Sequence, residues 1–336
     1  MPRHDPAARH ARPLRAILAG FAAVLPLAVI LMVAADAQTT KRKAGTKGKT
    51  SQAQMQAGAD SLARADSLLR VAAVQAAAES LWRSQDSVQA FARDTVQAFV
   101  FRKIDNSAFG VGERLVFDIS YGLITAGEAT LTIAGYDSIA GRTAFRVEVL
   151  VNSLPSFSWI YKVEDRYLTF IDVEAIASLR FEQHIREGSY VRDFVAEFDH
   201  PNGVARTSEG EFPIPPYVHD IMSAFYYART LDLGSMQDGD LVTLQNFYKD
   251  KTYDLGVRIL GRQELEVPAG TFHTIVVEPL VREGGLFKSE GRIVIWLTDD
   301  ERKMPVRVNT KVIIGSIDTE LREYSGTSGP VRARIQ

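Results

Sequence analysis

The chain of 336 residues contains no cysteine. This absence excludes disulfide bonds, zinc sites with cysteine ligands, iron–sulfur clusters and catalysis by a thiolate. It also excludes attachment of a lipid to an N-terminal cysteine after export. The folded part of the protein must therefore be held together by its core alone.

The patterns that mark common catalytic and metal sites are also missing. The four histidines between residues 108 and 325 form neither HExxH nor HxH, and they are His184, His200, His219 and His273. No Gly-x-Ser-x-Gly elbow is present, and no glycine-rich phosphate loop follows an expected strand. The sequence predicts a protein that is not an enzyme and has no catalytic residues, no metal site and no cofactor.

Two polar groups keep an alternative open. His219 and Asp220 stand together at the start of an expected helix, where an acid–base pair competes with simple helix-end electrostatics; the second is favoured. The run Asp299, Asp300 and Glu301 offers oxygen ligands for calcium. It lacks the one-three-five spacing of a calcium loop, so it indicates a solvated turn.

An excess of positive charge is missing from most of the chain. Residues 1–50 hold nine of the 39 basic and two of the 41 acidic side chains. The remainder therefore has 30 basic and 39 acidic residues, a net charge of −9. Such a body repels a phosphate backbone, so we expect no nucleic-acid partner.

The N-terminus has the pattern of an export signal. Four arginines precede an apolar run over residues 16–35, and Ala35-Asp36-Ala37 is a small-x-small cleavage signature. We expect a signal peptide at 1–37, cleavage after Ala37, and a periplasmic or cell-envelope location. An uncleaved anchor stays open, because a run of roughly 20 apolar residues can also span a bilayer.

Two segments separate this signal from the main domain. Residues 38–58 are polar and basic with almost no large apolar side chain, which predicts a disordered linker. Residues 59–100 shift to Ala, Leu, Gln and Ser, with an apolar stripe of helical spacing up to about residue 95. We expect a helical spacer, which is also a candidate surface for an envelope protein partner (59–95).

From about residue 108 to 325 the apolar period becomes two, which predicts a β domain. The expected strands are 113–122, 127–136, 143–151, 158–171, 175–187, 189–199, 241–248, 252–264, 272–282, 288–298, 304–314 and 317–324. Short turns join most of them, so the strands should form an antiparallel meander. One helix is expected over 215–234, with Pro216 in its first turn and Gly234 at its end.

The number of strands predicts a curled sheet. Twelve strands at a spacing of roughly 4.8 Å would make a flat sheet roughly 58 Å wide. One helix is roughly 10–12 Å across, so it can cover only two or three strands. Because nearly every strand has an apolar face, a flat sheet would expose more apolar surface than soluble monomers tolerate. The expected fold is a mainly β, large curled antiparallel sheet, an incomplete or closed barrel around one α-helix.

A curled wall of this size leaves a lumen that the helix, a ligand or both must fill. The leading hypothesis is that a lipid, an acyl chain or another hydrophobic envelope molecule binds there without covalent attachment. The candidate lining residues are Phe117, Ile119, Tyr121, Trp159, Tyr161, Phe225, Ile295 and Leu297. The alternative is a structural or protein-interaction module of the cell envelope whose core is filled by its own side chains.

Four segments resemble the bacterial family called domain of unknown function 3108. They are 112-GERLVFDISYGLITAGEATLTI-133, 219-HDIMSAFYYART-230, 266-EVPAGTFHTIVVEP-279 and 296-WLTDDERKMPVRVNTKVIIGSIDTEL-321. The resemblance covers about residues 108–324 and implies an exported envelope protein, with no catalytic residues to carry over. A curled sheet around one helix is also similar to the periplasmic lipoprotein carriers, whose incomplete barrels hold acyl chains.

Overall fold

The computed structural model describes residues 99–281, 292–312 and 315–335. The expected signal peptide, the linker and nearly all of the expected helical spacer lie outside the described residues and stay predictions. The β domain described below comprises the described residues from Phe101 onward.

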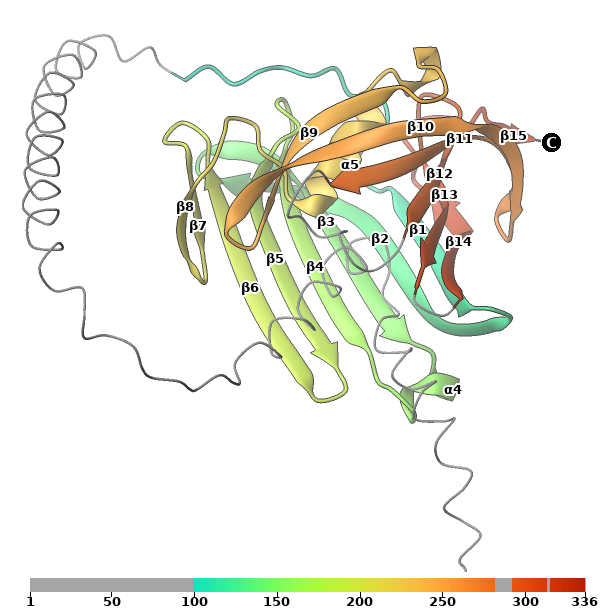
Figure 1. Cartoon of the computed structure of the whole chain (residues 1–336). Helices are drawn as coiled ribbons and strands as arrows, with labels where there is room; N and C mark the ends of the chain where they lie inside the picture. The colour runs from blue at the N-terminus through green and yellow to red at the C-terminus, as the bar shows by residue number, and fades with distance from the viewer. Residues whose placement is uncertain (1–98, 282–291, 313–314, 336) are drawn as a thin grey trace, which may run out of the picture. The chain divides into compact units, whose positions relative to one another are not determined.

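The described strands form one sheet in which every neighbouring pair is antiparallel (Figure 1). They are β1 (Arg114–Tyr121), β2 (Ile124–Ile139), β3 (Arg142–Ser153), β4 (Glu164–Asp172), β5 (Ser178–Glu187), β6 (Tyr190–Asp199), β7 (Val204–Thr207), β8 (Gly210–Pro213), β9 (Leu241–Tyr248), β10 (Lys251–Val267), β11 (Gly270–Val281), β12 (Ile293–Thr298), β13 (Pro305–Lys311), β14 (Ser316–Ser325) and β15 (Arg334–Ile335). The order across the sheet is β8-β7-β6-β5-β4-β3-β2-β1-β14-β13-β12-β11-β10-β9, and β15 pairs with β11. The predicted antiparallel meander is confirmed.

Three strands were not expected, and one was expected too early. β7, β8 and β15 have two to four residues each, too few for an alternating pattern to be visible. The expected strand over 158–171 begins only at Glu164, because the chain first makes the short helix α4 (Pro155–Ser158). The alternation through residues 158–163 therefore did not indicate a strand.

The β1–β2 hairpin is tighter than expected. Its link consists of Gly122 and Leu123, and Gly122 has φ +59°, a conformation that costs glycine little. Gly127 does not flank this turn but lies inside β2, where an added Cβ would come 3.0 Å from the carbonyl oxygen of Asn152 on β3. Its small size serves the close approach of two strands.

The sheet curls until its two ends meet, but it does not close. Phe247 on β9 lies 5.7 Å from the ring of Phe198 on β6 and 6.1 Å from that of Phe212 on β8. β8 and β9 are nevertheless not paired with each other. The segment before the helix lies along part of β9 instead, since the His219 N–H donates to the carbonyl of Gln245 (2.9 Å) and the Phe247 N–H donates to that of His219 (2.7 Å). Of the two predicted forms, the incomplete barrel is confirmed.

The expected helix is present as α5 (Ile221–Thr230), inside the curl (Figure 1). It begins five residues later than the sequence suggested, because Asp220 caps it and Pro216 lies ahead of it. A 3₁₀ turn over Leu233–Ser235 follows. The outer face of the sheet is wet where Asp118, Arg146, Glu148, Lys162 and Glu164 stand, since all five are exposed or half-buried. Among the described residues, no helix combines the length and apolarity needed to span a membrane.

Candidate binding cavity

An apolar cavity lies between α5 and the sheet formed by β9, β10, β11 and β12. Its lining residues are Ile221, Met222, Ala224, Phe225 and Ala228 on α5, and Leu244, Leu255, Val257, Val277, Pro279, Ile295 and Leu297 on the strands. No charged or hydrogen-bonding side chain is among them. The cavity therefore suits an apolar group.

The strand register brings these residues together. Leu244 on β9 stands opposite Leu255 on β10, and Val257 stands opposite Pro279 on β11. Val277 is in turn paired with Ile295 on β12. Side chains opposite each other on one face of a sheet are close neighbours, so the four strands present one continuous apolar wall.

The interior of the cavity is small. It measures about 60 Å³, below the roughly 300–1,000 Å³ of typical small-molecule pockets and below the cavity of about 150 Å³ that is known to hold a benzene ring. It therefore has room for a short stretch of alkyl chain and not for a whole lipid.

The N-terminal end of α5 is fixed by Asp220. One oxygen of this buried carboxylate accepts bonds from the N–H groups of Met222 (2.8 Å) and Ser223 (3.0 Å). The other oxygen accepts from the hydroxyl of Thr169 on β4 (2.7 Å) and from that of Ser178 on β5. Burial raises the pKa of Asp220, although these hydrogen bonds favour its ionised form. Asp220 therefore caps the helix and ties it to the wall.

The C-terminal end is fixed by Arg229, which is completely buried. Its guanidinium donates to both carboxylate oxygens of Glu113 (2.7 and 2.8 Å). It also donates to the carbonyl oxygens of Arg302 (3.1 Å) and Ala108 (3.2 Å). Burial lowers the pKa of Arg229, but the charge and hydrogen bonds of Glu113, with smaller contributions from Tyr226 and Asp300, outweigh it, so the pKa is raised. The geometry is bidentate and fully paired, as a buried ion pair requires.

His219 and Asp220 do not form an acid–base pair. Asp220 accepts hydrogen bonds from four groups, and His219 is not among them. The imidazole of His219 lies against the ring of Tyr227 at 4.8 Å, and its Nδ1 has no hydrogen-bond partner. Burial and the positive charge of Arg102 lower the pKa of His219 to about 3, so the ring is neutral at pH 7. The hydrogen bonds of Asp220 are those of a residue that caps a helix.

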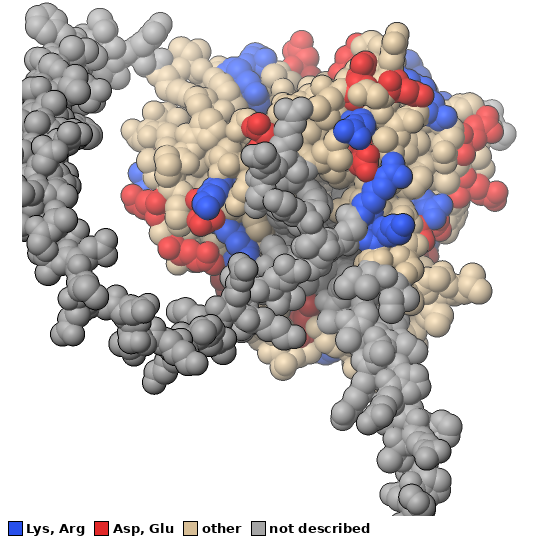
Figure 2. Space-filling model, in the orientation of Figure 1, with Lys and Arg blue, Asp and Glu red and all other residues tan. Residues whose placement is uncertain are grey.

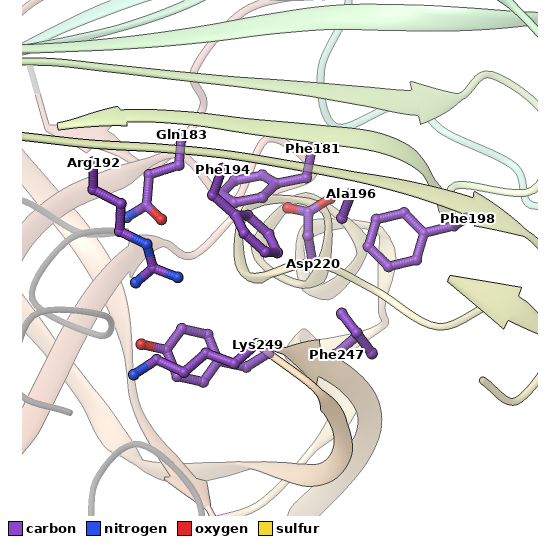
Figure 3. A pocket seen from close by; sticks show the side chains of 10 residues that line it. Phe181, Gln183, Arg192, Phe194, Ala196, Phe198, Asp220, Phe247 and Lys249 are labelled. Carbon is purple, nitrogen blue, oxygen red and sulfur yellow. The ribbon is translucent and has the colours of Figure 1, made fainter. Parts of the chain in front are cut away.

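A second, smaller pocket lies between β5, β6 and the β9–β10 hairpin (Figure 3). Its lining residues are Phe181, Gln183, Arg192, Phe194, Ala196, Phe198, Asp220, Phe247, Tyr248 and Lys249. Arg192 and Lys249 lie on one side and the phenylalanine rings further in. The interior measures about 10 Å³, at the limit for a single water molecule. This pocket is too small for a ligand, so the apolar cavity is the candidate site.

Two buried carboxyl groups lie elsewhere on the wall, on β4 and β5. Asp165 accepts from the Arg186 N–H (2.7 Å), and the hydroxyl of Tyr161 donates to Glu187 at 3.4 Å. Burial raises the pKa of both carboxyls, and the charge of Asp165 raises that of Glu187 further, to about 8. Glu187 therefore keeps its proton at neutral pH. Among the described residues, no group of three or more histidine, aspartate or glutamate side chains could hold a metal ion.

The predicted lining residues fall into three groups. Phe225, Ile295 and Leu297 line the cavity. Phe117 and Ile119 are buried in the core on β1, and Tyr121 and Tyr161 are half-buried beside it; none of these four lines the cavity. Trp159 was placed wrongly: its side chain is 80% exposed, because α4 interrupts the alternation that pointed it inward.

Reasoning from the sequence missed most of the strand lining, including Leu244, Val277 and Pro279. The alternation of Leu255 and Val257 showed which residues face inward. It did not show which strands α5 would leave uncovered, since that depends on how the helix is anchored.

The outer surface of the domain differs in character from the apolar cavity. Figure 2 shows lysine and arginine side chains interspersed with acidic ones over the part of the domain in view. Many are paired: Arg322 reaches Asp118 and Glu128, each at 2.6 Å, across β14, β1 and β2. Surface ion pairs of this kind contribute little to stability and define no ligand.

A family model matches residues 116–322, and its description is "Protein of unknown function (DUF3108)". The chain belongs to this family, which confirms the resemblance noted from the four sequence segments. Among the curated proteins, none matches this chain.

Three solved structures are similar in parts of their fold. The first is a β-barrel-like protein of the domain of unknown function DUF1849 from Brucella abortus, 10% identical, covering 67% of this chain and 99% of its own, with a TM-score of 0.45. The second, from Parabacteroides distasonis, is described as a candidate lipoprotein. It is 12% identical, and the match covers 68% of this chain and 99% of that one, with a TM-score of 0.32. The third, from Bacteroides fragilis, is described as a candidate exported protein with a YmcC-like fold. It is 14% identical, and the match covers 68% of this chain and 100% of that one, with a TM-score of 0.26.

Proposed function

We propose that this protein is a non-enzymatic, exported protein of the cell envelope that binds the alkyl chain of a lipid in the cavity between α5 and β9–β12. The observation that supports this function is a slot lined only by apolar side chains, beside a helix anchored at both ends. Burial of one CH₂ group is worth about 0.8 kcal/mol, so the free energy of binding should grow with the length of alkyl chain that is buried.

The cellular location rests on the N-terminal sequence. The basic head, the apolar run 16–35 and the small-x-small site at residues 35–37 are typical of export, with cleavage after Ala37 placing the mature protein in the periplasm. Lipids with long alkyl chains are the most abundant apolar molecules there. The proposal includes no nucleic-acid partner, because the chain beyond residue 50 is acidic.

Two neighbouring substitutions on β10 test the cavity. Val257 lines it, whereas Arg258 is exposed on the opposite face of the same strand. Val257→Trp should fill the slot and abolish binding of cis-parinaric acid, a linear fluorescent fatty acid. Arg258→Trp should bind the probe as the wild type does.

The same proteins can be examined by native mass spectrometry after purification from their own host. We expect a bound lipid on the wild type and on Arg258→Trp, and none on Val257→Trp. The proposal is wrong if the folded wild type carries no lipid and leaves the probe unbound. Equal binding by Val257→Trp, with its fold verified by circular dichroism, would place the ligand elsewhere.

A further inference from the structure

Three links of the sheet emerge side by side at one end of the domain. They are the β1–β2 link, the β3–β4 segment that contains α4, and the β5–β6 link; α4 and the β5–β6 link lie at the lower end of the view in Figure 1. Adjacent antiparallel strands place every second link at the same end. Backbone bonds join the three: the Leu154 N–H donates to the Ala126 carbonyl (2.9 Å), and the Gly188 N–H to that of Lys162 (2.8 Å).

Each link exposes two large apolar side chains, which we call the apolar rim. Its members are Leu123, Ile124, Trp159, Ile160, Tyr190 and Val191. They make up six of the eleven large apolar side chains that are exposed among the described residues. Single exposed apolar residues need no explanation, but six on three joined links form a patch that does.

The polar groups around Trp159 are satisfied by bonds within its own segment. The indole N–H of Trp159 donates to the carbonyl of Ser156 (2.9 Å), so the ring projects without an unsatisfied donor. The N–H groups of Ile160 and Tyr161 both donate to the carbonyl of Phe157 (2.8 and 3.1 Å). A segment that satisfies its own polar groups can leave water at low cost.

The chemistry of the rim matches a lipid surface. Residues 122–125, 154–161 and 188–191 contain no charged side chain, although 24% of the chain is charged. The first charged residues after the second and third links are Lys162 and Arg192, whose positive charges suit the anionic phosphate groups of a lipid surface. Tryptophan and tyrosine are the side chains that favour the membrane interface. The apolar run at 16–35 also brings the chain to a membrane during export.

We propose that the apolar rim inserts into the interfacial layer of a lipid bilayer, so that this end of the β domain faces the membrane. A protein partner fits less well, since a stable interface needs roughly 800 Å² and about 20–30 residues on each side, and the rim has six large apolar residues. The inference does not rest on the proposed function, because docking needs no ligand in the cavity.

Tryptophan fluorescence of the full chain tests it. The chain has three tryptophans, Trp82, Trp159 and Trp296, so Trp82→Phe with Trp296→Phe leaves the rim reporter alone. The control carries Trp159→Phe as well and moves the reporter to the other end of β2 by Tyr136→Trp, an exposed position. Vesicles of phosphatidylcholine and phosphatidylglycerol, with and without brominated lipid, supply the surface.

The Trp159 reporter should shift to shorter wavelength and be quenched by brominated lipid, while the control reporter should do neither. Leu123→Asp with Val191→Asp should remove most of the quenching. Val257→Trp should leave it unchanged, which separates this inference from the cavity ligand.

The apolar run can hold the chain on vesicles in every variant, so the comparison measures which end faces the lipid. Equal responses of both reporters, or a Trp159 that stays as accessible to acrylamide as in solution, would overturn the proposal. A blue shift that appears without vesicles would overturn it too, in favour of a protein contact.

Discussion

The buried ion pair at the end of α5 gives the sharpest prediction. Arg229→Met keeps the apolar stem and removes the guanidinium. Glu113, which is 1% exposed, then loses its counter-ion and both hydrogen bonds, and the carbonyls of Ala108 and Arg302 lose one donor each.

The magnitude follows from these losses. Removing one partner of a buried pair costs about 3–5 kcal/mol, because the remaining charge stays uncompensated. Each lost bond to a carbonyl adds about 0.5–1.5 kcal/mol. We therefore expect Arg229→Met to lower the free energy of unfolding by about 4–8 kcal/mol, much of the total for a domain that is stable by roughly 5–15 kcal/mol.

A second variant separates the charge from the packing. Arg229→Met with Glu113→Leu removes both charges, and well-packed apolar replacements of buried pairs are often neutral. The double variant should recover most of the loss and retain only the cost of the carbonyl bonds. The two substitutions are thus expected to be strongly non-additive.

Urea unfolding followed by circular dichroism measures Arg229→Met, the single variant Glu113→Leu and the double variant. Arg206→Met is the matched control, since Arg206 pairs with Asp199 at 3.0 Å but is half exposed, and an exposed pair contributes little to stability. If Arg229→Met costs no more than this control, or if the double variant loses as much as the two single variants combined, the pair does not fix the helix.

Two further predictions concern buried carboxyl groups. Because the pKa of Glu187 is raised in the folded state, its contribution to stability is complete below the unfolded value near about 4.3 and is lost as the pH rises through about 8. Glu187→Gln should therefore flatten the fall of the urea midpoint between about pH 4.5 and 8, while the exposed Glu164→Gln should not; an unchanged slope would contradict this. Asp220→Ala should cost at least the roughly 0.5–2 kcal/mol of a lost helix cap, plus the unpaired Thr169 and Ser178 hydroxyls, and Asp220→Asn should recover part of it in the same assay.

The alternation of apolar and polar residues predicted most strands of the sheet. A strand buries every second side chain, and this pattern can be seen in the local sequence. The helix start was harder, since Pro216 and Asp220 both offer plausible beginnings. The capping bonds of Asp220 to Met222 and Ser223 decide it, together with its bonds to two strands that are distant in sequence. Local propensity cannot anticipate such tertiary contacts.

The site was less predictable than the wall. Trp159 was predicted to line the cavity because its side chain is large and aromatic, but the short helix α4 turns it outward. The smaller residues Val257 and Val277 define the slot instead, through pairings between strands. The polar anchors at Asp220 and Arg229 were also hidden, because charged side chains in a sequence give no sign of being buried.

These anchors explain why the cavity is not filled by the protein itself. If α5 moved against β9–β12, filling the interior of about 60 Å³ would gain only about 1.4 kcal/mol, at about 24 cal/mol per Å³. The movement would break the bonds of Arg229 to Glu113, at a cost of about 3–5 kcal/mol. Because this cost exceeds the gain from packing, the helix stays in place and the cavity persists. An alkyl chain that enters it collects the packing energy without breaking either anchor.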